Sequence, residues 1–369
     1  MATIWLSQPS RFAGLSKRRA RIGLALLLIL LIATLSALAV PAPPAVSGDV
    51  AKRADDQADV VLYEAIVDGV RHGGNYYTVA ADQLRAGDYP MKPFVTFRLP
   101  TLAVAQAMLP SWTVVLLLYV LAAGVMVAWF RRLRPAFARP PPLLLAMVLL
   151  AGGLGAFVQA DLASFHEVWA GLLIALSLAL RRPGQWVAAA GIGALAMLVR
   201  ETSALYVAAM CLLALAEGER KEAAGWAAGV ALLAIVVVAH AHAVAQVVRP
   251  LDPASPGWSG MLGFGFFVEA ITLSTALRLA PMWFAALLMG FTLFGWAAWR
   301  DGTGLRALVT FALYAALIGL FGRVDTFYWG LMVAPAILVG LAFAPDGLKD
   351  LIAAAFPRQR KITVTRITP

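Results

Sequence analysis

The chain has 369 residues, of which 61% are hydrophobic and only 14% are charged. Soluble globular proteins carry roughly 25% charged residues, so this composition excludes an ordinary water-soluble enzyme. The net charge of +10 belongs to the flanks of hydrophobic segments, as shown below, and we expect no nucleic-acid partner. Cys211 is the only cysteine, which excludes an intrachain disulfide and a cysteine-based metal site.

Apolar runs recur along the whole chain, and most are close to the roughly 20 residues that span a bilayer as a helix. The sixth of them is short. The runs are residues 22–40, 112–130, 143–158, 166–180, 185–199, 204–216, 225–248, 281–299, 306–321 and 328–344. We therefore predict an all-α polytopic membrane protein with about ten transmembrane helices, forming one integral membrane domain over residues 1–369.

The first run needs separate interpretation. Basic residues at 17–21 precede it and Ala37-Leu38-Ala39 ends it, which is also the pattern of a secretory signal with its cleavage site. The run of 19 residues exceeds the ~7–15 residues of a signal-peptide core. We interpret it as an uncleaved membrane anchor.

The basic residues predict the orientation. With ten spans and a cytoplasmic N-terminus, 20 of the 30 Lys and Arg residues lie on the cytoplasmic side, as the positive-inside rule requires. These are Arg11, Lys17, Arg18, Arg19, Arg21, Arg131, Arg132, Arg134, Arg139, Arg181, Arg182, Arg220, Lys221, Arg300, Arg306, Lys349, Arg358, Arg360, Lys361 and Arg366. We predict a bacterial inner-membrane protein with both termini cytoplasmic, long periplasmic loops at 41–111 and 249–280, and a cytoplasmic tail at 345–369.

An amphipathic helix is predicted over residues 56–71 in the first periplasmic loop. At 100° per residue, one side is polar (Gln57, Glu64, Asp68 and Arg71) and the other is apolar (Tyr63, Ile66, Val67 and Val70). Asp59 lies on the apolar side, one turn before Tyr63. Burying a carboxylate costs several kcal/mol unless it is compensated, so Asp59 is either paired or functional. Asp55 and Asp56 precede the helix and would cap it. A second helix is predicted around residues 76–85.

Charged residues also mark the periplasmic ends of other helices. Arg98 either reaches lipid headgroups or binds an anion. Glu167 either completes a capping box with Ser164 or belongs to a site, and Arg323 occupies a short outer loop where an anion ligand fits.

Two further sites lie at membrane depth. Arg200 and Glu201 are adjacent on a predicted helix, where side chains point about 100° apart, so we do not expect them to satisfy each other fully; an ionisable residue there is a functional candidate. His240 and His242 cannot share a helix face. Either His240 is a hydrogen-bonded interior residue or it contacts a phosphate.

Carboxylates and arginines ringed by aromatic residues at one membrane surface suit a lipid-linked phosphate substrate. Arginine binds phosphate in a bidentate manner, and a carboxylate can act as base on an acceptor hydroxyl. The sequence contains no Walker loop, His/Cys metal cluster or Gly-x-Ser-x-Gly nucleophile motif, and no paired, Gly/Pro-broken helices of a secondary transporter.

The segment from Asp59 to Tyr77, followed by Phe97-Arg98-Leu99-Pro100, resembles the first outer loop of bacterial polyprenyl-phosphate-dependent glycosyltransferases of the GT-C fold. The segments beginning at His166-Glu167 and at Val199-Arg200 also resemble patterns that follow the third and fifth helices of that superfamily. In these enzymes an acidic residue a few positions before a Tyr is the catalytic base. The resemblance implies Asp59 as the base with Tyr63 as its partner, and Asp56 as the alternative base.

The resemblance further implies transfer of a sugar from a polyprenyl-phosphate donor to a periplasmic glycan or lipid acceptor, with inversion. The donor phosphate would lie near Arg98, Arg200 or Arg323. The other substrate contacts would come from Tyr63, Glu167, Glu201 and His240. Some members use a divalent cation and others do not, so the metal site stays open.

Two alternatives remain at this stage. A glycan polymerase or ligase of the envelope would differ mainly in its acceptor. A transporter or flippase for a lipid-linked substrate would need charged groups along a path through the membrane. In this sequence the charged groups gather at the outer ends of the helices instead.

Overall fold

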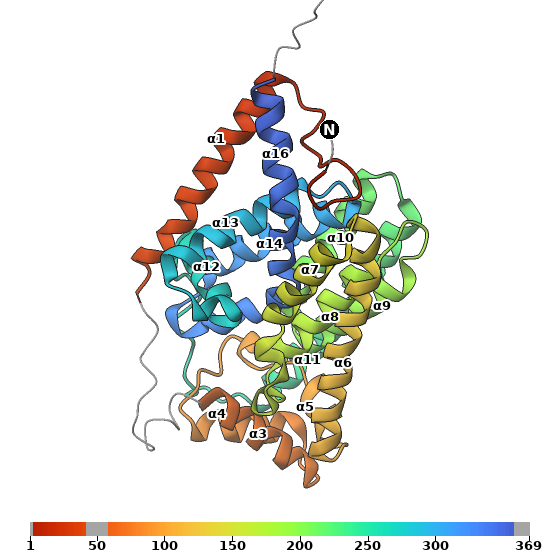
Figure 1. Ribbon diagram of the computed structural model, residues 1–369. Helices are drawn as coiled ribbons and strands as arrows, with labels where there is room; N and C mark the ends of the chain where they lie inside the picture. Colours follow the sequence, from red (N-terminus) through yellow and green to blue (C-terminus); the bar gives the residue numbers. More distant parts are fainter. Residues whose placement is uncertain (1–2, 42–57, 358–369) are drawn as a thin grey trace, which may run out of the picture.

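The computed structural model describes residues 3–41 and 58–357, and within these ranges the chain is all-helical, without a β-strand. Two ends can be distinguished in Figure 1. The helices α1 (Lys17–Thr34) and α16 (Ala344–Ala355) reach one end, which we call the terminal end. The helices α3 (Ala58–Arg71), α4 (Tyr76–Ala86) and α5 (Thr101–Ala107) lie at the other, which we call the loop end.

Four helical segments are long and apolar enough to cross a membrane: Lys17–Ala39 (α1 and η1), Ser111–Ala136 (α6 and η3), Arg220–Val247 (α11) and Gly302–Phe321 (α14). A fifth results if η8 (Val324–Met332) and the helices from Ala334 to Ala355 count as one span bent by 61°. Shorter apolar helices are α7 (Pro140–Gly153), α8 (His166–Leu180), α9 (Val187–Val199), α10 (Ala204–Ala216), α12 (Gly263–Ser274) and α13 (Met282–Ala298). The predicted runs fall mainly on helical segments, but among the described residues the count of ten spans is not confirmed.

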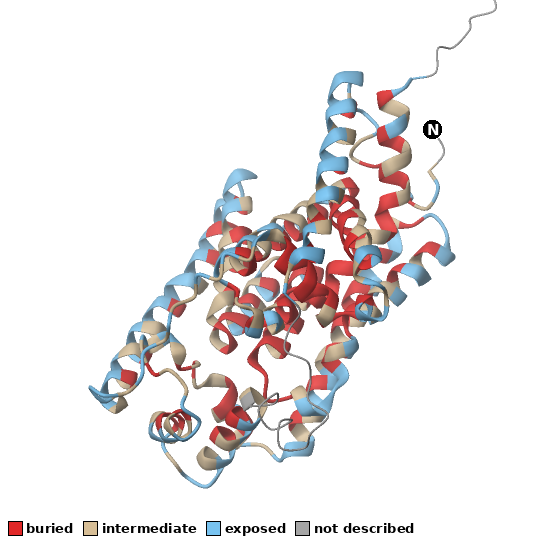
Figure 2. Ribbon diagram, turned by 90° about the vertical axis from the view of Figure 1, so that its left-hand side faces the viewer, coloured by how far each residue is buried: buried red, intermediate tan, exposed pale blue. Residues whose placement is uncertain are grey.

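The peripheral helices expose large apolar side chains, which a soluble protein would bury. Leu26, Leu28 and Ile32 of α1 are about 60% exposed, and Ile235 and Val238 of α11 about 70%. Figure 2 shows the buried residues concentrated in the middle of the bundle. This distribution is consistent with a multi-pass membrane protein, as the composition predicts.

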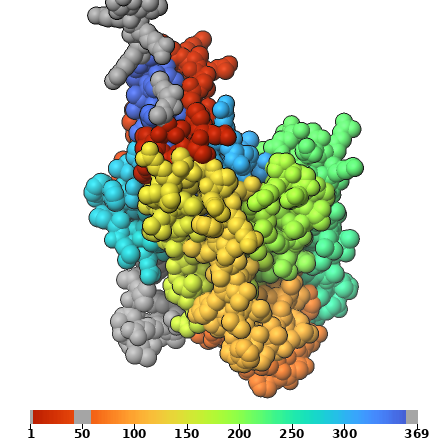
Figure 3. Space-filling model, turned by 45° about the vertical axis from the view of Figure 1, so that its right-hand side comes forward, coloured from red at the N-terminus to blue at the C-terminus, as the bar shows by residue number. Residues whose placement is uncertain are grey.

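Both described ends of the chain are joined at the terminal end. The buried carboxylate of Asp346 in α16 accepts hydrogen bonds from the backbone N–H groups of Ile4, Trp5 and Leu6 at 2.6–3.0 Å, and Asp350 accepts one from Ser10. Residues 345–357 are therefore not a free tail, as the sequence suggested, but a helix packed on α1 and α13. The helix α16 has an apolar face, and this face packs against α1 and α13. The basic residues 358–369 lie outside the described residues. Figure 3 shows the two ends of the chain (red and blue) together, opposite the orange loop end.

The second long loop predicted at 249–280 contains a buried helix, α12, which the sequence analysis missed. Nine of its 12 residues are buried, and it packs against η1, η8 and α14. A helix of this length rises only about 18 Å, too short to span a bilayer. It is mostly apolar because it is enclosed by other helices, and its one charged residue, Glu269, is buried.

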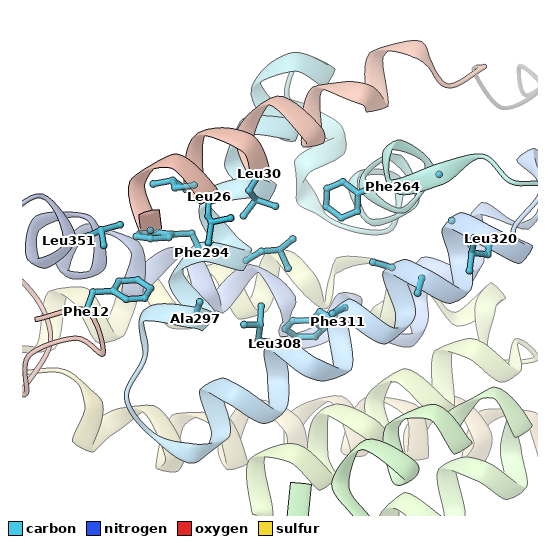
Figure 4. Close-up of a pocket in the computed structure, with 18 residues that line it drawn as sticks. Phe12, Leu26, Leu30, Phe264, Phe294, Ala297, Leu308, Phe311, Leu320 and Leu351 are labelled. Carbon is cyan, nitrogen blue, oxygen red and sulfur yellow. The ribbon is translucent and has the colours of Figure 1, made fainter. Parts of the chain in front are cut away.

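An apolar cavity of about 740 Å³ lies between α1 and helices α12, α13 and α14 (Figure 4). Phe12, Leu30 and Phe311 are among its lining residues, and every lining residue is Phe, Leu, Ala or Gly. A cavity without a polar group offers nothing to orient a polar substrate. It is therefore distinct from the candidate active site described next.

Candidate active site at the loop end

A cavity of about 1100 Å³ opens at the loop end, where α3 faces the start of α8 and the segment η8. Its lining residues include two carboxylates of α3, the partly buried Asp59 and the exposed Glu64, and three arginines, Arg98, Arg278 and Arg323. The candidate site is formed by Asp59 and the three arginines. These four residues come from four separate parts of the chain. The volume is that of a site for a sizeable ligand.

The helix α3 presents Asp59 to this cavity because its two faces are sorted as predicted. Tyr63 and Ile66 are buried, whereas Glu64 and Asp68 are exposed. Asp59 itself is partly buried, and Tyr89 donates a hydrogen bond to its Oδ1 at 3.0 Å. Burial and the nearby Asp59 carboxylate raise the pKa of Tyr89, which keeps the phenol protonated as a donor. Asp56, the alternative base, lies outside the described residues.

Arg98 turns inward, which excludes one of the two interpretations left open by the sequence, that it reaches lipid headgroups. Its Nε donates a hydrogen bond to the hydroxyl of Tyr63 at 3.1 Å, and its guanidinium lies 3.5 Å from Glu167 and 3.8 Å from Glu201. Tyr63 thus contacts Arg98 rather than Asp59. Burial is the largest influence on Tyr63 and raises its pKa, so this hydroxyl stays protonated.

Behind the cavity wall, Arg200 joins Glu167 and Glu201. Arg200 Nε donates to Glu167 Oε1 at 2.7 Å, and its Nη1 pairs with Glu201. The capping box at Ser164 is absent: α8 begins after Phe165 without a side-chain cap. Arg200 and Glu201 pair through one carboxylate oxygen, because α9 ends at Val199 and Arg200 is extended (φ −142°, ψ 108°). Oε2 of Glu201 has no partner, so the two residues do not satisfy each other fully, as predicted, although they are not on one helix. We call Arg98, Glu167, Arg200 and Glu201 the loop-end cluster.

The mouth of the cavity carries the two remaining arginines. Arg323 is ion-paired with Asp325 at 2.8 Å, and both residues line the cavity. Arg278, on η7 (Ala276–Leu279), lines the cavity, and its guanidinium has no ion pair or hydrogen bond to another described residue. The sequence analysis did not single it out, because an arginine in a long loop has no pattern around it that marks a site.

His240 does not line this cavity, which corrects its assignment as a phosphate contact. Its Nδ1 is 3.2 Å from the hydroxyl of Tyr77 and its Nε2 is 3.3 Å from the carbonyl oxygen of Phe97. It therefore fastens α4 and the chain around Phe97 to α11. This is the interior, hydrogen-bonded interpretation that the sequence left open.

Three uncharged polar residues on the cavity wall have no hydrogen-bond partner. These are Ser164, His166 and Trp329, whose Oγ, both ring nitrogens and Nε1 respectively are buried and unpaired. The side chains of Ser164 and His166 belong to residues only 7% and 3% exposed. Sequence reasoning missed all three, because a polar residue in an apolar context is usually satisfied by its neighbours.

A metal site is not evident in the described part of the chain, where no three His, Cys, Asp or Glu residues lie close enough to hold an ion. The cavity instead combines a carboxylate held by a tyrosine, arginines at its mouth and uncharged polar groups on its wall. Such a set can remove a proton from a hydroxyl and bind a phosphate.

Comparison with known proteins adds no identification: no protein-family model, curated protein or solved structure matches this chain.

Proposed function

We propose that this protein is a membrane glycosyltransferase that transfers a sugar from a polyprenyl-phosphate donor to a hydroxyl of a glycan or lipid acceptor. The observation that carries the proposal is the convergence of Asp59, Arg98, Arg278 and Arg323 on one cavity of an apolar, multi-helix protein. A lipid-linked donor needs an apolar protein for its chain and cations for its phosphate, and the acceptor needs a base.

In the proposed reaction, the acceptor hydroxyl attacks the anomeric carbon of the donor. The bond from that carbon to the phosphate oxygen breaks, and the polyprenyl phosphate leaves with the electron pair. Asp59 takes the hydroxyl proton, while the hydrogen bond from Tyr89 holds the carboxylate in place. One displacement of this kind inverts the anomeric configuration.

The donor phosphate fits the arginines at the mouth of the cavity better than the arginines of the loop-end cluster. Within the loop-end cluster two arginines are balanced by two glutamates at 2.7–3.8 Å, so Arg98 and Arg200 have little attraction left for an anion. Arg278 has no carboxylate partner among the described residues, and Arg323 has only the exposed Asp325. We therefore assign the phosphate to Arg278 and Arg323, and assign Arg98 the positioning of Tyr63.

A polymerase or ligase would use the same donor chemistry and differ in its acceptor. Transport is less well supported, because the residues lining the polar cavity come from the loop end, and the cavity does not share a lining residue with the basic pocket around Arg132 and Arg182 at the terminal end. We further propose that the loop end faces the periplasm of a bacterial inner membrane, since the basic residues concentrate at the terminal end.

The proposal is tested by incubating the purified protein with a set of polyprenyl-phosphate sugars and an envelope extract as acceptor. We expect consumption of one donor, with release of polyprenyl phosphate. Replacing Asp59 by Asn should reduce the rate about 10²–10⁴-fold, the usual value of a general base, without loss of folding. Asp68→Asn, on the exposed side of the same helix, is the matched control. Full activity of the Asp59→Asn protein would remove Asp59 from the mechanism.

The orientation is tested with alkaline phosphatase, which is active only outside the cytoplasm. A fusion after Gly87, at the end of α4, should be active, and a fusion after Pro369 should be inactive. An inactive Gly87 fusion would place the cavity on the cytoplasmic side and exclude a periplasmic acceptor. An active Pro369 fusion would contradict the predicted cytoplasmic C-terminus and the orientation derived from the basic residues.

A further inference from the structure

The wall of the cavity beside Tyr63 is built differently from its mouth. The mouth carries charged groups, whereas the wall carries Ser164, His166 and Trp329, whose polar side-chain atoms have no hydrogen-bond partner among the described residues. The guanidinium of Arg200 lies over the Trp329 ring, 6.0 Å from its centre. A hydroxyl, an imidazole and an indole together supply several hydrogen-bond donors and at least two acceptors. A phosphate would use only the donors, and a cation only the acceptors. A neutral ligand group with both functions satisfies the whole set.

Buried polar groups without a hydrogen-bond partner reduce the stability of the folded protein. A buried polar group without a partner loses about 1–3 kcal/mol relative to its hydrated state, and His166 has two unpaired ring nitrogens although only 3% of the residue is exposed. Buried polar atoms in proteins are nearly always paired. Four unpaired atoms on one cavity wall therefore indicate partners supplied by a ligand.

Aromatic rings border the same wall. Phe165 stands edge-on to Tyr63 at 5.6 Å and to Tyr328 at 5.3 Å, and the ring of His166 is 5.0 Å from that of Tyr63. All four residues line the cavity. Aromatic faces carry negative partial charge and pack against the C–H groups of a sugar ring, while the hydroxyls of that ring need neutral donors and acceptors.

From these contacts we infer that Ser164, His166 and Trp329 form a subsite for the uncharged sugar ring of the donor, with His166 at its centre. The inference rests on the proposed function and deepens it: the phosphate lies at the arginines of the mouth, and the sugar lies inward against the wall. His166 then determines whether the protein distinguishes a sugar-bearing lipid phosphate from a bare one.

The test measures equilibrium binding in nanodiscs, by tryptophan fluorescence, of bare decaprenyl phosphate and of the same lipid phosphate carrying glucose, mannose or arabinose. The unmodified protein should bind at least one sugar-bearing lipid more tightly than the bare lipid, by about 10- to 100-fold, the value of one or two hydrogen bonds to buried groups. His166→Leu should remove this preference and leave the affinity for bare decaprenyl phosphate unchanged. His166→Gln, which keeps a donor and an acceptor, should retain part of the preference.

His72→Leu is the matched control, because His72 lies in the same loop-end region with its side chain 74% exposed; it should behave like the unmodified protein. Melting temperatures of all variants exclude general unfolding as the cause. Equal weakening of both kinds of lipid by His166→Leu, or no sugar preference in the unmodified protein, would overturn the subsite. A His166-dependent sugar preference without any transfer would support the subsite and refute the transferase. Sugar transfer, together with an unchanged sugar preference in His166→Leu, would support the transferase and refute the subsite.

Discussion

A cluster of two arginines and two glutamates lies at each end of the helix α8, buried except for Glu217 and the partly exposed Glu201, and the two clusters differ in how their carboxylates are satisfied. At the terminal end, Arg181 and Arg306 pair with Glu222 and Glu217 at 2.5–2.9 Å. All four carboxylate oxygens of this terminal-end cluster accept a hydrogen bond, and Trp226 adds one to Glu222. At the loop end, Oε2 of Glu167 and Oε2 of Glu201 are buried without a partner.

This difference is the one we expect between a structural cluster and a cluster that serves the proposed active site. Buried ion pairs repay their desolvation best when their remaining hydrogen-bonding capacity is used. In the terminal-end cluster every carboxylate oxygen is paired and Nε of Arg306 is the buried atom left without a partner. This cluster fastens the ends of α8, α11 and α14. The loop-end cluster stands directly behind the wall of the polar cavity and leaves two oxygens unused. Two unpaired carboxylate oxygens next to a polar cavity are what we expect of residues that serve the proposed substrate site.

The largest expected effect comes from breaking the terminal-end cluster. Glu222→Ala leaves the buried Arg181 with only Glu217 at 3.4 Å, and removing one partner of a buried pair costs about 3–5 kcal/mol. We expect a loss near 3 kcal/mol in the free energy of unfolding, measured in mixed detergent micelles, and unchanged transfer activity per folded molecule. Glu219→Ala, at an exposed neighbour, should change stability by less than about 0.5 kcal/mol.

The corresponding change at the loop end should affect activity more than stability. Glu201 is 25% exposed at its side chain and contacts both Arg98 and Arg200. Glu201→Gln removes one of the two carboxylate charges that hold Arg98, and through it Tyr63, against the cavity. Because small displacements in a site cost up to about 10²-fold in rate, we expect a 10- to 100-fold lower kcat with at most about 1 kcal/mol lost in stability. Destabilisation equal to that of Glu222→Ala, with normal activity per folded molecule, would show that the two clusters have the same role.

A smaller effect is expected at the mouth. Arg278→Ala removes an exposed cation proposed to bind the donor phosphate, and exposed charge pairs are worth about 1 kcal/mol or less. The KM for the donor should rise about fivefold, kcat should hold, and the difference should shrink at high salt. Arg249→Ala, at an exposed arginine of the same loop that does not line the cavity, provides the comparison. Equal effects of both substitutions would point to general attraction by the surface charge.

Sequence reasoning reached the amphipathic helix α3 and the inward position of Asp59, because both follow from a helical period that solvent and core enforce. It also selected all four residues of the loop-end cluster, since ionisable groups at membrane depth need a reason to be there. It could not find α12 or the packing of α16 against the bundle. The hydrophobic pattern of a short apolar segment does not distinguish a loop from a buried helix. Nor could it find His166, Ser164 and Trp329. These residues stand out because their buried polar atoms have no hydrogen-bond partner, which only the three-dimensional structure shows.

The smallest effect concerns an ion pair outside the bundle, which sharpens the contrast with the two buried clusters. Arg85 of α4 donates to both carboxylate oxygens of Asp252 at 2.9–3.0 Å and so fastens α4 to the chain after α11. These hydrogen bonds, with one from the backbone N–H of Arg249, lower the pKa of Asp252 to about 2, below the unfolded value near 3.9. A lowered carboxyl pKa stabilises the folded state above the unfolded pKa, and this contribution is lost as the pH falls towards 2. Hydrogen exchange of α4 should therefore be faster in Arg85→Met than in the unmodified protein, by an amount that is constant from pH 5 to 8 and shrinks below pH 4. A difference between the two proteins that grows in acid would show that Asp252 does not hold α4 through its charge.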